Sequence, residues 1–268
     1  MTRERHVTAP RWAWRTWGRE GAPRLLLLHG FAGAAAFWAP LADIWAADWH
    51  VLAPDLPGHG ASEAPQAGYG LAEAAEGLAL ALTGPTTVVG YSLGGRLAAH
   101  LAVAHPERVT RLVLIGASAG LATPAERAAR LEADARWAAM LRERGLDAFL
   151  DAWEALPLFA GQRTVPTERQ DRLRTLRAGL SAEGLAAAMT AFGLGTQDDL
   201  RERLAALAVP TWWAAGAKDE KFSTIAREMA SAMPDARAVV VPDCGHNVAF
   251  ERPEAIVELL NHVADTPL

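Results

Sequence analysis

The stretch "TTVVGYSLGGRLAAHLA", Thr86 to Ala102, decides the fold. Its β-branched beginning favours a strand, and its end, rich in alanine and leucine, has the spacing of a helix. Between the two lies a Gly-x-Ser-x-Gly pentapeptide with Ser92 at its centre. A sharp turn from strand to helix strains its central residue and leaves room only for glycine beside it. The stretch therefore predicts a nucleophile elbow, which presents the Ser92 hydroxyl at the end of a strand.

Strands and helices alternate on both sides of this turn. Short runs rich in β-formers, such as "PRLLLLHG" and "TWWAAG", are separated by segments with helical periodicity. This alternation indicates an α/β fold, a mostly parallel sheet flanked by helices. Between Leu121 and Leu207 only helical patterns occur. We therefore expect a core formed by residues 1–120 and 208–268 and a helical lid formed by residues 121–207.

Composition narrows the class of protein further. Of the 268 residues, 51% are hydrophobic, and the net charge of -5 gives no basic surface for nucleic acid. No segment approaches the roughly 18 apolar residues of a membrane span, and the N-terminus lacks the apolar core of a signal peptide. A single cysteine, Cys244, excludes an intramolecular disulfide, and no cluster of metal ligands occurs. We expect a cytoplasmic protein without metal or cofactor; its oligomeric state stays open, and a monomer fits the sequence.

Ser92 needs an imidazole to take its proton and a carboxylate to orient that imidazole. Asp219 follows the strand "TWWAAG", and His246 follows the strand "AVVVPD". The carboxyl ends of parallel strands meet at one edge of the sheet, where both side chains can reach Ser92. Glu220 and Asp243 are alternative carboxylates, and a lone histidine is often only a satisfied loop residue. The order Ser, Asp, His favours a triad of Ser92, Asp219 and His246.

Three further segments, "LLLLHGFAG", "DLPGHGAS" and "CGH", extend the pattern around the elbow. With them, the chain resembles the α/β-hydrolase superfamily along nearly its whole length. The resemblance implies an oxyanion hole formed by the backbone N–H groups of Phe31 and Leu93, which would stabilise negative charge on a substrate oxygen. For His29, His59 and Asp55 we favour a structural role, in which the side chains hold loops in place, over direct catalysis.

Within that superfamily, one subgroup shares "GYSLGGR", "WEALPLF", "LGTQDDL" and "KDEKF" with this chain. These segments resemble the 2-succinyl-6-hydroxy-2,4-cyclohexadiene-1-carboxylate synthases of menaquinone biosynthesis. Members of that family eliminate pyruvate from 2-succinyl-5-enolpyruvyl-6-hydroxy-3-cyclohexene-1-carboxylate. The resemblance implies a lyase that needs no cofactor, in which Ser92 abstracts a ring proton as a base.

The family's substrate carries several carboxylates, and guanidinium groups bind carboxylates through paired donors. The resemblance implies five substrate-binding residues: Tyr91, Arg96, Arg130, Trp153 and Arg177. The expected partner is thus a small polycarboxylate.

Each of these positions has an alternative interpretation. Arg96 lies one helical turn beyond Ser92, where a buried arginine either pairs with a buried acid or binds an anionic substrate. Arg136 competes with Arg130 for the same role. Arg177, like any lid arginine, could lie on a solvated helix face, and Trp153 could anchor the core of the lid.

The chain departs from the family at one position and leaves other functions open. Three residues after His246 the family often has a second histidine, and this chain has Ala249. Lys221 is expected in solvent, and Cys244 is expected to pack as a small hydrophobic residue. A carboxylesterase or a hydrolase of carbon–carbon bonds would use the same triad, and a non-catalytic receptor for a small ligand could retain it.

Overall fold

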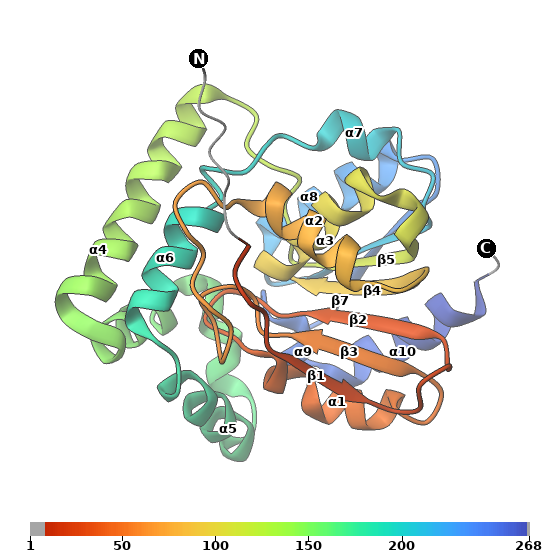
Figure 1. The fold of residues 1–268 in the computed structure, drawn as a ribbon, viewed down its shortest axis with the longest axis horizontal. Helices are drawn as coiled ribbons and strands as arrows, with labels where there is room; N and C mark the ends of the chain where they lie inside the picture. The colour runs from red at the N-terminus through yellow and green to blue at the C-terminus, as the bar shows by residue number, and fades with distance from the viewer. Residues whose placement is uncertain (1–8, 267–268) are drawn as a thin grey trace.

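The computed structural model describes residues 9–266, and a seven-stranded sheet forms its centre (Figure 1). The strand order is β1-β3-β2-β4-β5-β6-β7, with β1 antiparallel to β3 and all other neighbours parallel. The strands are β1 (Trp14–Trp17), β2 (Arg24–Leu28), β3 (His50–Pro54), β4 (Thr86–Tyr91), β5 (Val109–Ile115), β6 (Thr211–Gly216) and β7 (Ala236–Val241). The predicted mostly parallel sheet is confirmed.

Helices cover both faces of the sheet. The α-helices are α1 (Ala39–Trp45), α2 (Leu71–Ala81), α3 (Leu93–Ala104), α4 (Pro124–Glu154), α5 (Thr167–Ala178), α6 (Ala182–Phe192), α7 (Arg201–Ala205), α8 (Glu220–Ala232), α9 (Val248–Glu251) and α10 (Pro253–Asp265). Three short 3-10 helices are η1 (Ala35–Trp38), η2 (Pro106–Arg108) and η3 (Pro157–Thr164). Helices α2, α3 and α8 lie on one face, and α1, α9 and α10 lie on the other (Figure 1). None of the helices within residues 9–266 is long and apolar enough to cross a membrane.

The strand β2 shows why the sheet is buried on both faces. Leu26 and Leu28 pack into the core beneath α2 and α3, whereas Leu25 and Leu27 pack into the core on the opposite face. All four side chains are fully buried. Alternate residues of a strand point to opposite faces, so an unbroken apolar run marks a strand covered on both sides.

Helices α4 to α7 follow one another between β5 and β6, where the sequence predicts only helices. Thr123 begins this segment by capping α4, since its Oγ1 accepts a hydrogen bond from the Glu126 N–H at 3.1 Å. Gly145 has a φ of 79° and interrupts α4. Helices α4 and α6 lie side by side (Figure 1) and share an apolar core around Phe149 and Leu185.

Three buried histidines form no ion pair with any residue between positions 9 and 266. Burial lowers the pKa of His29 to about 4, that of His59 to about 3 and that of His100 to about 4. In the unfolded chain each histidine titrates near its ordinary value of about 6.5. Between pH 6.5 and 4 the unfolded state therefore binds more protons than the folded state, and the free energy of unfolding falls as the pH falls.

Replacing His100, which lies in α3 about two helical turns beyond Ser92, tests this contribution. We expect His100→Leu to make the free energy of unfolding less dependent on pH, by about 2 kcal/mol between pH 7.5 and pH 5. Urea titrations at the two pH values measure the difference. The exposed His262 provides a control, because His262→Gln should keep the wild-type dependence. Identical pH dependence in His100→Leu and wild type would contradict the prediction.

Candidate active site

Ser92 lies at the turn between β4 and α3, with φ 51° and ψ −109°. This left-handed conformation is strained for any residue other than glycine. The neighbouring glycines make the turn possible. A Cβ on Gly90 would lie 2.4 Å from the carbonyl oxygen of Gly94, and one on Gly94 would lie 2.2 Å from that of Leu28. Strand β4 therefore approaches α3, and α3 approaches the end of β2, too closely for a side chain at either glycine.

The structure brings Ser92, Asp219 and His246 together at the carboxyl ends of β4, β6 and β7. His246 Nδ1 lies 2.7 Å from Asp219 Oδ2, and His246 Nε2 lies 3.3 Å from Ser92 Oγ. With Nδ1–H donating to the carboxylate, Nε2 faces the serine as an acceptor. The alternative carboxylates, Glu220 and Asp243, are exposed.

Aromatic rings surround the imidazole of His246, which is only 2% exposed. Ring centroids of Phe222, Tyr91 and Phe159 lie 4.5, 5.5 and 6.1 Å from that of His246. Burial raises the pKa of Tyr91 far above its ordinary value, so its hydroxyl stays protonated. These contacts limit the rotation of the imidazole. Tyr91 contributes an uncharged side chain to this aromatic surface.

Glu251 holds the loop that carries His246, a role the sequence did not predict. Its Oε2 accepts a hydrogen bond from the Gly245 N–H at 2.6 Å, and its Oε1 accepts one from the Asn247 N–H at 3.2 Å. The two donors flank His246 in the chain. A glutamate five residues after the histidine, in "HNVAFE", is the signal that could have identified it.

We expect Glu251→Gln to lower the kcat of the reaction that the triad catalyses about tenfold with little change in KM, because a small displacement of a catalytic group is costly. The amide can accept only one of the two backbone hydrogen bonds, so the His246 loop loses a support. Steady-state kinetics and the melting temperature should be measured together with Glu254→Gln, an exposed control in α10. An unchanged kcat in Glu251→Gln would contradict a positioning role.

Phe31 and Leu93 carry the two backbone N–H groups expected to form an oxyanion hole. Leu93 is the first residue of α3, and Phe31 lies in the turn after β2 that a bond from Gly33 N–H to the Gly30 carbonyl closes at 3.1 Å. Among residues 9–266, no protein acceptor receives a hydrogen bond from either N–H. Both donors are thus available to a substrate oxygen.

His29, His59 and Asp55 hold the loops around this turn. His29 Nδ1 donates to the Gly30 carbonyl at 2.8 Å, and its Nε2 accepts from the Leu56 N–H at 2.9 Å. The two carboxylate oxygens of Asp55 accept backbone N–H groups at 2.7 and 2.9 Å from two different loops. His59 Nδ1 lies 3.2 Å from a backbone carbonyl oxygen. The structural role favoured from the sequence agrees with these contacts.

Arg96 extends from α3 toward the α4–α7 segment and has only neutral acceptors. Its Nη2 donates to the Phe192 carbonyl at 2.7 Å, and its Nη1 donates to Gln197 Oε1 at 3.2 Å. Within residues 9–266, no carboxylate lies at ion-pair distance from it. Burial lowers the pKa of Arg96 to about 9, which still leaves it charged at pH 7. Of the two interpretations, the structure therefore favours an arginine that awaits an anion.

Arg130 lies near Arg96, since its charge helps to lower the pKa of Arg96. It also forms an ion pair with Asp134, four residues further along α4, at 2.7 Å. Asp134 is buried, so Arg130 is partly neutralised where it stands. Arg136 is exposed. The structure brings Arg130, and not Arg136, toward the predicted substrate site.

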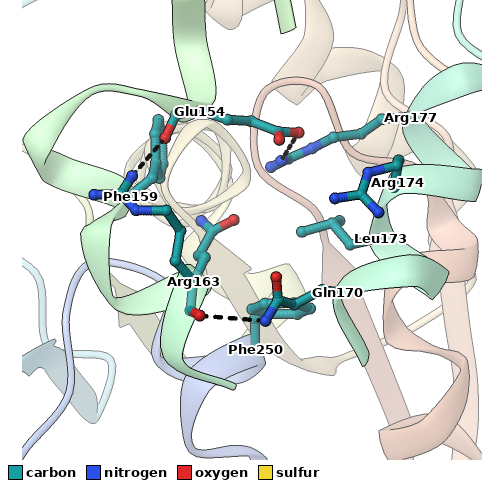
Figure 2. Close-up of a pocket in the computed structure, with 9 residues that line it drawn as sticks. Glu154, Phe159, Arg163, Gln170, Leu173, Arg174, Arg177 and Phe250 are labelled. Carbon is teal, nitrogen blue, oxygen red and sulfur yellow. Dashed lines mark hydrogen bonds and ion pairs between the residues drawn. The ribbon is translucent and has the colours of Figure 1, made fainter. Parts of the chain in front are cut away.

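Arg177 is buried, so the alternative of a solvated helix face is wrong for this residue. Its Nη1 forms an ion pair with Glu154 at 2.7 Å, visible in Figure 2. Its Nε donates to the carbonyl of Ala32, next to Phe31, at 3.4 Å. Arg177 therefore lies beside the turn that carries one of the oxyanion-hole donors, and Glu154 is a partner that the sequence did not predict.

Trp153 lies in an aromatic cluster that joins the α4–α7 segment to the turn after β2. Its ring stacks on Phe149 at 5.3 Å and contacts Phe31 at 5.4 Å. Its buried Nε1 has no hydrogen-bond partner among the described residues. Trp153 thus anchors this segment, as one interpretation expected, and retains a donor that a substrate could use.

The remaining positions singled out in the sequence have simple environments. Ala249 and Cys244 are buried in the apolar core beside α10. The alanine that stands where the family often has a histidine therefore contributes to packing. Lys221 is exposed, with its Nζ 5.6 Å from the Phe222 ring.

Comparisons with known proteins agree with this geometry. The family model described as the alpha/beta hydrolase fold matches residues 23–253. The 2-succinyl-6-hydroxy-2,4-cyclohexadiene-1-carboxylate synthase of Salmonella heidelberg is 36% identical over 92% of this chain and 95% of its own. The enzyme of the same name from an Enterobacter species is 37% identical over 92% of this chain and 93% of its own.

Solved structures give the same result. The structure of MenH from S. aureus superposes with a TM-score of 0.88 at 28% identity, over 94% of this chain and 96% of that one. A malate-bound thermophilic esterase from Thermogutta terrifontis has a TM-score of 0.83 at 27% identity, over 96% of each chain. The matches confirm the fold and the family predicted from the sequence. The chain belongs to the α/β-hydrolase fold family and, within it, to the 2-succinyl-6-hydroxy-2,4-cyclohexadiene-1-carboxylate synthases.

Proposed function

We propose that this protein is a lyase that eliminates pyruvate from 2-succinyl-5-enolpyruvyl-6-hydroxy-3-cyclohexene-1-carboxylate. The observation that carries the proposal is a half-buried arginine, Arg96, one turn of helix from a serine that is hydrogen-bonded to a histidine. Among residues 9–266 Arg96 has only neutral hydrogen-bond acceptors. The substrate is an anion with several carboxylates, and a carboxylate is the partner that the Arg96 guanidinium lacks.

The bonds of the substrate and product define the chemistry. The ring double bond of the substrate lies at position 3, and those of the product lie at positions 2 and 4. A proton must therefore leave C2, the electron pair forms the C2–C3 double bond, and the old double bond shifts to C4–C5. The C5–O bond breaks, and the enol of pyruvate leaves and tautomerises to the ketone.

We assign the base role to Ser92, activated by His246 and oriented by Asp219. His246 Nε2 takes the hydroxyl proton as Ser92 Oγ takes the proton from C2, and the imidazolium is stabilised by the Asp219 carboxylate 2.7 Å from Nδ1. The leaving enolpyruvyl group recovers the proton, so the triad ends each cycle as it began. No acyl-enzyme forms.

We assign charge stabilisation to the N–H groups of Phe31 and Leu93. C2 carries the succinyl group through its ketone, so negative charge at C2 is delocalised onto the ketone oxygen as an enolate. Two free backbone donors beside the serine stabilise such an oxygen without reorganisation. Their contribution is larger in the charged transition state than in the neutral ketone.

The substrate carboxylates are assigned to Arg96, Arg130 and Arg177, with Tyr91 and Trp153 as neighbouring walls. In this proposal, residues 121–207 form a lid over a core of residues 1–120 and 208–268. Arg130 and Arg177 come from the lid, and Arg96 comes from the core. Substrate binding therefore joins the two parts and excludes water from the enolate.

The test is the release of pyruvate from freshly generated substrate, followed with lactate dehydrogenase. We expect wild-type protein to accelerate release far beyond the spontaneous rate. Release no faster than the spontaneous reaction would refute the lyase.

The structural similarity to the Thermogutta esterase makes a carboxylesterase the second candidate. An esterase forms an acyl-serine, so it would release p-nitrophenol from p-nitrophenyl esters in a burst equal to the enzyme concentration. We expect no burst. A burst accompanied by no acceleration of pyruvate release would establish the esterase instead.

A further inference from the structure

A groove lined by η1, α1, α5 and α9 lies outside the substrate site, and we call it the α1–α5 groove. It encloses about 540 Å³, the size of a site for a small organic molecule. Phe37 and Leu41 come from η1 and α1, Ala249 and Phe250 come from α9, and three prolines complete the apolar lining. The buried Leu41 and Phe250 form its base, and the half-buried Phe37 forms a wall.

Contacts within the protein hold the aromatic wall of the α1–α5 groove in place. The ring of Phe37 stacks on that of Tyr91 at 6.1 Å and meets that of Trp38 edge-on at 5.1 Å. Phe37 also packs against a small apolar cluster that contains Leu173 and Phe250. Because these contacts fix the ring before a ligand binds, binding orders little of the protein.

Two arginines border the α1–α5 groove without carboxylate partners. Within residues 9–266, neither Arg169 nor Arg172 lies at ion-pair distance from a carboxylate. Arg169 Nη1 donates to the Phe250 carbonyl at 2.8 Å, and Arg172 is exposed. Partial burial and the charge of Arg169 lower the pKa of Arg172, and the charge of Glu168 opposes this shift. Glu168 also lines the groove, so one net positive charge remains there to attract an anion.

The α1–α5 groove lies on a different face of α5 from Arg177, which we assign to the substrate. Arg172 and Arg177 are five residues apart, which places them roughly 140° apart around the helix. The cavity in Figure 2 lies on the Arg177 side, with Leu173 and Arg174. Among residues 9–266, only Phe250 lines both spaces. A ligand in the groove would therefore contact none of the arginines assigned to the substrate.

We propose that the α1–α5 groove is a binding site for a small organic anion that has an aromatic or branched apolar body and one anionic group. The body packs against Phe37, Leu41 and Phe250, and the anionic group lies beside Arg169 and Arg172. A small polar anion gains nothing from the apolar lining, and a neutral or cationic molecule gains nothing from the arginines. The site is independent of the proposed lyase activity.

Isothermal titration with 2-naphthoate, a flat aromatic carboxylate, and with 2-naphthamide, its neutral counterpart, tests the site. We expect saturable binding of 2-naphthoate to the wild type and about fivefold weaker binding of the amide, which lacks the charge. In Arg172→Gln, 2-naphthoate should bind about fivefold more weakly, and the difference between the two ligands should shrink. Phe37→Leu should weaken both ligands equally, about fivefold, because it removes only an aromatic contact.

Two variants serve as controls in these titrations. Arg174→Gln removes the same charge from an exposed residue on the other face of α5 and should bind 2-naphthoate as the wild type does. Arg96→Met removes an arginine of the proposed substrate site and should not change the binding of 2-naphthoate. Failure of the pyruvate-release assay would therefore leave the titration results intact.

Four results would overturn the proposal. The first is no saturable binding of 2-naphthoate to the wild type. The second is equal weakening in Arg172→Gln and Arg174→Gln, which would indicate a general charge effect. The third is a loss of binding in Arg96→Met alone, which would place the ligand in the substrate site. The fourth is a dimer, seen by sedimentation velocity, that dissociates in Arg172→Glu, because a second copy of the chain would then cover the groove.

Discussion

Replacing Ser92 by alanine is expected to lower the rate of enzyme-dependent pyruvate release by about 10³-fold, the typical contribution of a positioned base. In the variant, His246 Nε2 has no hydroxyl to deprotonate, and no oxygen lies between Nε2 and the proton on substrate C2. Removing a hydroxyl from the elbow changes no packed side chain, so the melting temperature should stay close to that of the wild type. Single-turnover release of pyruvate measures the loss independently of product dissociation.

Rates of the wild type, Ser92→Ala and a control variant together show whether Ser92 is the base or takes no part in proton transfer. Ser231→Ala, which removes an exposed hydroxyl of α8, serves as the control and should keep the wild-type rate. If Ser92→Ala released pyruvate as fast as wild type, then His246 or a water molecule would be the base, and the assignment of Ser92 would be wrong. If neither the Ser92→Ala variant nor the wild type released pyruvate faster than the spontaneous reaction, the proposed reaction itself would be wrong.

The elbow could be predicted because its requirements are local. The glycine at position 90 is dictated by the turn itself, since a Cβ there would lie 2.4 Å from the carbonyl oxygen of Gly94, four residues along the chain, and such a contact leaves a pattern in consecutive residues. Asp219 and His246 could be predicted because parallel strands place their carboxyl ends at one edge. To predict either residue, only the strand that precedes it had to be recognised in the sequence.

The partners of the arginines could not be predicted in the same way. Gln197 binds Arg96 across 101 residues of sequence, and Glu154 binds Arg177 across 23. These pairs depend on how α4, α5 and α6 pack, which no local pattern specifies. Arg130 and Arg136 differ by six residues, which turns them about 120° apart on one helix. Only the docking of α4 decides which of them faces Arg96.

Replacing Arg96 by methionine is expected to raise KM for the substrate roughly 100-fold while kcat changes only a few-fold, since charged hydrogen bonds contribute up to about 3 kcal/mol. The acceptors of Arg96 are the Phe192 carbonyl and the Gln197 amide, both neutral. The variant therefore leaves no buried carboxylate unpaired, and the expected loss of folding free energy is only about 1–2 kcal/mol. Arg96→Lys should recover part of the affinity, because it keeps the charge and loses the paired donors.

Kinetics and urea unfolding should be measured on the same preparations. Arg136→Met, at an exposed position of α4, is the control and should leave KM unchanged. A large rise in KM with nearly wild-type stability places the guanidinium of Arg96 against a substrate carboxylate. A variant that unfolds readily yet keeps its KM would show that Arg96 instead serves the packing of α6 onto α3. The two outcomes separate because the Phe192 and Gln197 contacts belong to the fold, whereas the uncompensated charge is free to bind the substrate.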